Sequence, residues 1–78
     1  MTEKLYYEFK ALNYSLEELK EKEHKLCDEI TNIYHGISIA ITRNDLESFK
    51  KLNDKRFDVH CALSAVRILI NQMESDLG

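Results

Sequence analysis

Apolar residues recur every three or four positions along almost the whole chain. The first series is Leu5, Phe9, Leu12, Leu16, Leu19, Glu23, Leu26, Ile30, Ile33, Ile37 and Ala40, and the second is Phe49, Leu52, Arg56, Val59, Leu63, Val66, Ile70, Met73 and Leu77. Only Glu23 and Arg56 are polar. A repeat that averages ~3.5 residues is typical of helices that pack side by side along a seam. The pattern therefore predicts an all-α fold built on a long antiparallel helical hairpin.

The composition agrees with long helices and excludes several other folds. The 78 residues include no proline, and Gly36 is the only internal glycine. Such a chain does not suit a sheet, a glycine-rich phosphate loop or a Rossmann-type fold. No apolar run is long enough to span a bilayer, so we expect no membrane association. The N-terminus lacks a basic stretch followed by an apolar one, which predicts no signal peptide and a cytoplasmic location.

A first break in the helical pattern is predicted around residues 13–15. Ser15 and Glu18 have the spacing of a capping box, and Tyr14 and Leu19 have the spacing of a hydrophobic staple. These signals predict a helix over about residues 16–41, preceded by a separate short helix over about residues 2–13. The apolar spacing nevertheless continues through the junction without a change of phase. One uninterrupted helix is therefore the alternative.

A second break lies between Gly36 and Asp45, where two arrangements compete. In the first, the helix passes through Gly36, residues 42–44 form a tight turn, and Asn44 caps a last helix over about residues 45–77, with Glu47 at its third position. In the second, Gly36 ends the helix in a left-handed conformation and a longer connection follows. The continuing apolar phase favours the tight turn, although a glycine inside a helix costs about 1 kcal/mol.

The length of this turn decides which residues face the two seam charges. With the tight turn, Glu23 lies opposite the region of Leu63 and Arg56 lies opposite Ile30, so the two charges do not meet. With the longer connection they would form a pair. A charge at a seam is unfavourable unless it is paired or its head group reaches water. We therefore expect both residues either at the seam edge or in an ion pair.

The last helix has more apolar surface than one hairpin contact can cover. Beside its seam lie Cys61, Ala65, Ile68 and Leu69. A helix that is apolar over most of its circumference is usually buried on more than one side. We therefore expect these four residues at an oligomer interface, in a dimeric helical bundle whose chains each form a single domain over residues 1–78. Folding of the N-terminal segment back onto the hairpin is the alternative.

No combination of residues indicates catalysis, a cofactor or a metal site. His24 and Asp28 stand one helical turn apart, but neither a Glu-x-x-His nor a His-Glu-x-x-His motif is present. Cys27 and Cys61 are too few and too far apart for a zinc cluster. The tight turn would place them level, which makes a disulfide the alternative to two free thiols. His60 directly precedes Cys61, but adjacent side chains on a helix do not face each other. We therefore expect a protein that is not an enzyme.

Aromatic residues are the best candidates for contact with another protein. The candidates are Tyr7, Tyr14, Tyr34 and Phe57. Exposed aromatic side chains are enriched at binding surfaces. The function expected from them is that of a small non-catalytic interaction module, a regulator, adaptor or inhibitor that acts as a homo-oligomer and binds another protein. Alternatively, the same side chains cover the hairpin ends or lie inside the dimer interface.

A basic cluster suggests a second class of function. It consists of Lys50, Lys51, Lys55 and Arg56. Asp54 and Asp58 lie among these residues, and the net charge of the chain is −3, whereas nucleic-acid binding usually needs a basic surplus. A dimer could still align two copies of the cluster. Nucleic-acid binding is therefore the alternative function, together with capture of a small anionic ligand between subunits.

Overall fold

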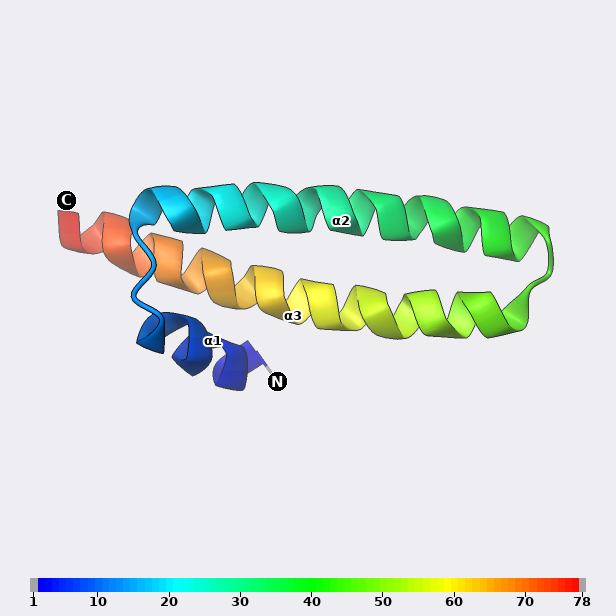
Figure 1. Cartoon of the computed structure of the whole chain (residues 1–78), viewed down its shortest axis with the longest axis horizontal. Coiled ribbons are helices and arrows are strands. Elements are labelled where there is room, and N and C mark those ends of the chain that lie inside the picture. Colours follow the sequence, from blue (N-terminus) through cyan, green and yellow to red (C-terminus); the bar gives the residue numbers. More distant parts are fainter. Residues whose placement is uncertain (1, 78) are drawn as a thin grey trace.

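Three helices make up the computed structural model, which describes residues 2–77, the last of them by its backbone alone. The helices are α1 (Thr2–Ala11), α2 (Leu16–Thr42) and α3 (Leu46–Leu77), and the described part of the chain contains no strand. α2 and α3 form a long antiparallel hairpin (Figure 1). The all-α fold is therefore confirmed, and each helix begins and ends within two residues of its expected bounds. The seam position expected for Leu77 lies outside the described side chains.

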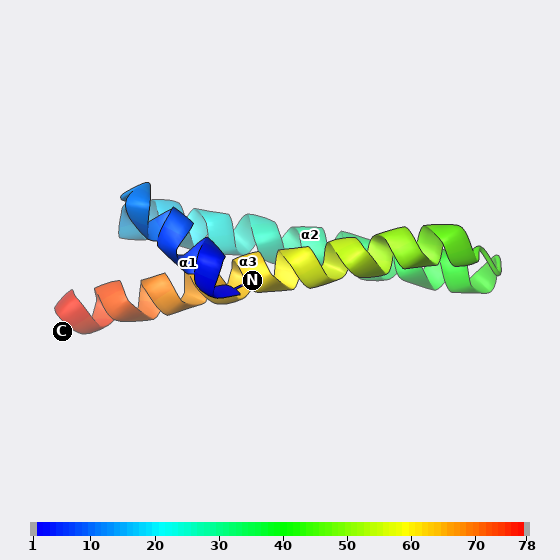
Figure 2. The same ribbon diagram turned by 90° about the horizontal axis from the view of Figure 1, so that it is seen from below.

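α1 is a separate helix that folds back along α3. It runs in the same direction as α3 and lies beside it in both views (Figures 1 and 2). The reversal occurs at Asn13, whose φ of 54° is in the left-handed region. α2 then starts with the expected capping box: the Glu18 amide donates to Ser15 Oγ at 3.2 Å, and the Ser15 amide donates to Glu18 Oε1 at 3.2 Å. The break is therefore real, and the two helices are not continuous.

The tight turn between α2 and α3 is also confirmed. The Asn44 amide donates to the Ile41 carbonyl at 3.1 Å, and the Asp45 amide donates to the Ala40 carbonyl at 2.8 Å. These are the two hydrogen bonds of a Schellman motif, in which Asn44 takes the left-handed position with a φ of 56°. We will call this end of the hairpin the tip, and the end formed by the start of α2 and the end of α3 the open end.

The cap of α3 differs by one residue from the expectation. Asp45, not Asn44, is the capping residue, because its carboxylate accepts hydrogen bonds from the Ser48 amide at 3.1 Å and from Ser48 Oγ at 2.7 Å. These bonds stabilise the ionised carboxylate and lower the pKa of Asp45 below its ordinary value of 3.8. The assignment to Asn44 is wrong because that residue is needed in the left-handed position that ends α2.

Gly36 lies inside α2 and allows α3 to approach closely. A Cβ atom at this position would lie 3.1 Å from Cδ1 of Leu52 on α3. The glycine therefore does not end the helix, and the loss of helix propensity at Gly36 coincides with a close contact between the two helices.

The core consists of two clusters along the hairpin. Leu19, Val66, Leu69 and Ile70 form the cluster nearer the open end, where Tyr6 and Phe9 of α1 also pack. Ile30, Ile33, Val59 and Leu63 form the cluster nearer the tip, which contains side chains from α2 and α3 only. α1 thus completes the core at the open end and leaves the tip as a two-helix structure.

Most of the residues expected at an oligomer interface are already buried in the single chain. Cys61, Ala65 and Leu69 are buried within the single chain, Ala65 completely, whereas Ile68 is 42% exposed. Phe9 of α1 packs against the cluster that contains Leu69, and Leu5 lines a recess together with Cys61. Two of the four expected interface residues, Cys61 and Leu69, therefore lie beside side chains of α1, and Ala65 stands between them on the same line of α3.

Candidate functional site

Five large apolar side chains are exposed near the tip. One of them, Ile39, lies about 200° around α2 from Ile41 and therefore projects from another side of the helix. The other four are Tyr34 and Ile41 of α2 and Leu46 and Phe57 of α3, and their exposed fractions lie between 47% and 74%. Tyr34 and Ile41 are two helical turns apart, and Leu46 and Phe57 are three turns apart, so each pair projects from one side of its helix. We call the surface formed by these four residues the tip face.

Contacts between the two helices involve three of the four members of the tip face. Ile41 and Leu46 line a recess of about 190 Å³ together with Phe49, across the turn. Further from the turn, the Tyr34 hydroxyl lies 3.3 Å from Nε2 of His60 on α3. The guanidinium of Arg56 lies over the Tyr34 ring, 5.9 Å from its centroid. Ile41 and Leu46 therefore meet across the turn, Tyr34 contacts α3, and Phe57 shares the side of α3 that carries Leu46.

Arg56 has an unusual environment within this surface. Its Nε atom is buried and has no hydrogen-bond partner among the described residues. The residue occupies a seam position, where its positive charge is stabilised by the cation–π contact with Tyr34. As expected for the tight turn, Arg56 does not pair with Glu23, because the two residues lie at different heights along the hairpin and Glu23 pairs with Arg67 instead.

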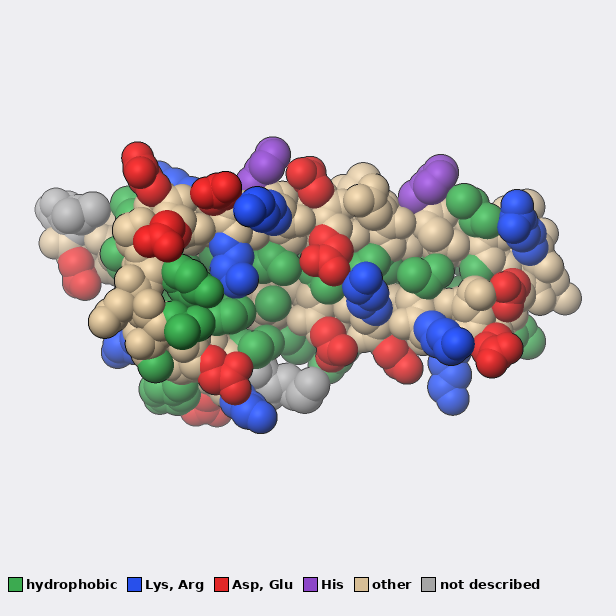
Figure 3. All heavy atoms as spheres, viewed as in Figure 1, with side chains coloured by type: hydrophobic (Ala, Val, Ile, Leu, Met, Phe, Trp, Pro, Cys, Tyr) green, Lys and Arg blue, Asp and Glu red, His purple; other side chains and the backbone are tan. Residues whose placement is uncertain are grey.

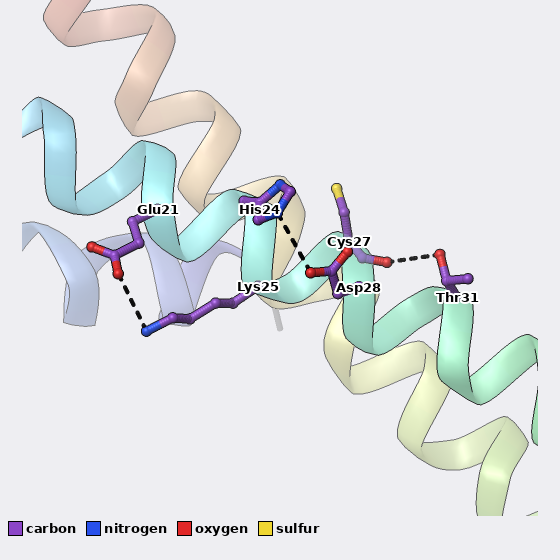
Figure 4. Close-up of polar contacts among 6 residues, drawn as sticks. All are labelled: Glu21, His24, Lys25, Cys27, Asp28 and Thr31. Carbon is purple, nitrogen blue, oxygen red and sulfur yellow. Dashed lines mark hydrogen bonds and ion pairs between the residues drawn. The ribbon is translucent and has the colours of Figure 1, made fainter.

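The charge pattern of α2 separates the tip from the open end. Charged side chains occur throughout residues 17–29, whereas residues 30–42 contain no Asp, Glu, Lys or Arg. In the charged half, Lys25 pairs with Glu21 and His24 pairs with Asp28, each at 3.5 Å along the helix (Figure 4). Acidic and basic side chains are mixed over the face shown in Figure 3. The uncharged half of α2 is the half that contributes Tyr34 and Ile41.

The four aromatic candidates from the sequence fall into two groups. Tyr34 and Phe57 belong to the tip face. Tyr7 is exposed on α1, and its ring lies 5.1 Å from that of Tyr6. Tyr14 is half-buried in the core at the open end, where its ring is in contact with that of Phe9. The candidates therefore do not form one surface, and Tyr14 packs inside the fold.

Ile41 and Leu46 belong to the tip face but were not among the sequence-derived contact residues. The apolar spacing places Ile41 on the same flank of the seam as Tyr34, but it does not show that Leu46, at the start of the last helix, lies next to them. The signal that points to them is the uncharged stretch of α2 directly before the turn. This stretch leaves exposed apolar side chains without the charged neighbours that surround them elsewhere on the helix.

The basic cluster does not form a single surface. Lys55 Nζ lies 3.6 Å from the Glu29 carboxylate on α2, and Arg56 lies over Tyr34. Lys50 and Lys51 are exposed neighbours, which point about 100° apart around a helix. The four positive charges are therefore spread around α3, and the geometry does not favour a phosphate backbone as ligand.

The two cysteines are free and face different parts of the structure. Arg67 Nη2 lies 3.7 Å from Cys27 Sγ, on the side of the seam where Arg67 also contacts Glu23. Cys61 is buried and lines a recess beside α1. The two cysteines do not form the disulfide that was the alternative to free thiols. Their side chains lie on different faces of the hairpin.

In the part of the chain that the structure describes, the pair formed by His24 and Asp28 has no further metal-binding side chain beside it. His24 and Asp28 are both exposed, and within residues 2–76 no three His, Cys, Asp or Glu side chains are gathered in a way that could hold a metal ion. In the same part of the chain, no helix combines the length and the apolar character that crossing a bilayer requires. Comparisons with protein-family models, curated proteins and solved structures found no match.

Proposed function

We propose that this chain is a small non-catalytic protein-interaction module, a regulator, adaptor or inhibitor that acts as a homo-oligomer and binds another protein through its tip face. The observation that supports this proposal is the exposure of Tyr34, Ile41, Leu46 and Phe57 on one surface next to the uncharged half of α2. Contiguous apolar patches on soluble proteins commonly mark interaction sites.

The residue types of the tip face agree with a protein partner. Aromatic side chains and arginine dominate the energetics of protein interfaces, and the tip face contains Phe57 and Tyr34, the latter in contact with Arg56. The shallow recess between Ile41 and Leu46 fits a single apolar side chain better than a cofactor-sized ligand. A partner with an apolar helix or ridge and an acidic rim would complement the tip face and Arg56.

The partner contact is tested by site-specific photo-cross-linking. A photoreactive amino acid replaces Phe57 in one protein and Tyr7 in a matched control, because both positions are exposed aromatics but only Phe57 belongs to the tip face. We expect one defined protein to be cross-linked in extracts of the native host at position 57 and not at position 7. The Tyr34→Ala variant should reduce that product at least tenfold while circular dichroism shows an unchanged helix content.

The proposal is wrong in this form if both positions give the same products, or if the product is unaffected by Tyr34→Ala and Ile41→Ala together. Self-association is measured separately, as the absolute mass by light scattering over a dilution series. A dimer or larger species is expected because α3 has apolar surface beside its seam, of which Ile68 remains 42% exposed in a single copy. A monomer at all concentrations would contradict the homo-oligomer.

A further inference from the structure

α1 packs on α3 beside an apolar stripe. Cys61, Ala65 and Leu69 are spaced four residues apart, so they form one line along α3, and all three are buried. The small side chain of Ala65, fully buried, lets the covering helix approach α3 closely. Leu5 of α1 lies beside Cys61 and Phe9 lies beside Leu69, so a helix of this sequence can lie along the stripe.

α1 is held on this stripe by modest contacts. The helix has only 10 residues, and none of them is buried. Recesses of about 310 Å³ and about 270 Å³ border its contact with α3, the first beside Leu5 and the second beside Phe9. Among the described residues, one side-chain hydrogen bond joins α1 to the hairpin, from the Tyr6 hydroxyl to Gln72 Oε1 at 2.8 Å. A helix of this length is not stable alone, so α1 needs a docking site but is not tightly fixed to its own.

The connection between α1 and α2 can become helical. Residues 12–15 contain neither glycine nor proline. The apolar series Leu5, Phe9, Leu12, Leu16 and Leu19 crosses the connection in steps of four and three. If Asn13 left its left-handed conformation for the right-handed one, α1 and α2 would join into one helix with the apolar side chains of both parts on the same face. The apolar spacing is therefore compatible with a second arrangement besides the folded-back one.

The straightened chain is complementary to a second copy of itself. Straightening makes α1 project beyond the open end and uncovers the stripe on α3. α1 runs parallel to α3 and antiparallel to α2 in the folded-back chain (Figure 1). A second copy, rotated by a twofold axis at the open end, presents its α3 parallel to the projecting α1. The same contacts can then form between copies, twice, in a closed symmetric dimer.

We propose that the homo-oligomer is a dimer in which the two copies exchange α1, so that α1 of each chain covers Cys61, Ala65 and Leu69 of the other. This inference rests on the homo-oligomeric part of the proposed function. It gives the oligomer a defined contact and places the two tip faces at opposite ends of an elongated particle. Both tip faces would be free to bind a partner at the same time.

The first test uses proline at position 16. Ser15 is extended, with a φ of −71° and a ψ of 163°, which is the conformation required before a proline. Leu16 is the first residue of α2, where proline is well tolerated. In a straightened helix, the same proline would be internal and would break it. Leu16→Pro is therefore expected to keep the folded-back chain and weaken dimerisation at least ~100-fold, whereas Leu16→Ala, which loses the same packing, stays dimeric.

The second test shows whether the α1 that lies beside Cys61 belongs to the same chain or to the other chain of the dimer. Leu5 and Cys61 line one recess, so a Leu5→Cys, Cys27→Ser variant can be bridged with a short bismaleimide. Exchange predicts a covalent dimer on a denaturing gel, and the folded-back chain predicts a covalent monomer. Cys27→Ser without Leu5→Cys is the control and should remain uncross-linked. In the Leu16→Pro background we expect the covalent monomer, which also shows that this variant keeps α1 in place.

The outcomes separate this inference from the proposed function. A dimer that gives inter-chain cross-links and is lost in Leu16→Pro but not in Leu16→Ala supports α1 exchange. A dimer with intra-chain cross-links only, or one that Leu16→Pro leaves unchanged, overturns the exchange and keeps the homo-oligomer. A wild-type monomer at every concentration overturns both.

Discussion

Arg67 on α3 donates a hydrogen bond from Nε to Oε2 of Glu23 on α2, at 3.1 Å. Glu23 is the polar residue in the apolar series of the first long helix, so this contact gives the seam charge its partner. The pair lies at the seam edge, where the side chain of Arg67 is 56% exposed and that of Glu23 is 33% exposed. The contact also specifies which turn of α3 lies opposite which turn of α2.

Removal of this pair should reveal a small coupling energy. We expect Glu23→Ala and Arg67→Ala to be non-additive by about 0.5 kcal/mol, because partly exposed ion pairs are weakened by solvent screening. Urea unfolding of the wild type, both single variants and the double variant measures this coupling. High salt should reduce it. Additive effects of the two substitutions would show that the pair contributes nothing to stability.

Asn44 should be replaceable by glycine but not by alanine. Its φ of 56° is accessible to glycine without strain and is unfavourable for a residue with an ordinary Cβ. We expect Asn44→Ala to lower the free energy of unfolding by about 1 kcal/mol, and Asn44→Gly to leave it unchanged or raise it. Urea denaturation of both variants distinguishes these effects. An equal loss in the two would argue against a conformational cause.

Asp45 should make the stability depend on pH in the acidic range. Its hydrogen bonds with Ser48 lower its pKa below 3.8 in the folded state, so the unfolded chain binds this proton first as the pH falls. The stabilisation by Asp45 is therefore present above pH 3.8 and is lost as the pH falls through the lowered pKa.

Asp45→Asn keeps a capping oxygen but removes this titration. The melting temperature of Asp45→Asn should accordingly fall less than that of the wild type between pH 5 and pH 2. Ser48→Ala should also reduce the pH dependence, because Ser48 supplies the hydrogen bonds. Parallel curves for the wild type and Asp45→Asn would exclude the assigned role.

Gly36 and Leu52 should be energetically coupled. Gly36→Ala gains about 1 kcal/mol of helix propensity but places a methyl group 3.1 Å from Leu52 Cδ1. We expect little net change in the wild-type background and a stabilisation of up to about 1 kcal/mol in a Leu52→Ala background, where the obstacle is absent. The cycle is measured by urea unfolding. Equal effects in both backgrounds would mean that Leu52 moves aside freely.

The surface under α1 should distinguish Ala62 from Ala65. Ala65 is fully buried, so Ala65→Leu is expected to overpack the contact and lower the free energy of unfolding by about 1–3 kcal/mol. Ala62 lines the recess of about 310 Å³, which has room for a larger side chain. Ala62→Leu should therefore be neutral or stabilising in thermal unfolding. A loss of similar size in both variants would contradict the packing of α1 described above.

The sequence by itself determined the helices and their ends. The capping box at Ser15 and Glu18 and the apolar spacing through Gly36 depend on residues that are three or four positions apart, and such neighbours meet in any helix whatever packs around it. The tight turn could be inferred in the same way. The cap at Asp45 was missed by one residue because Asn44 and Asp45 are both good caps, and only the observed turn requires Asn44 in the left-handed position.

The tertiary structure alone decided how the helices face one another. Whether α1 continues α2 or folds back onto α3 depends on a choice at Asn13 that the apolar spacing leaves open. The pairing of Glu23 with Arg67, the separation of Cys27 from Cys61 and the assembly of the tip face all depend on the rotation and register of α2 against α3. Periodicity describes one helix at a time, whereas rotation and register are set by contacts between helices, such as the close approach of Leu52 to Gly36.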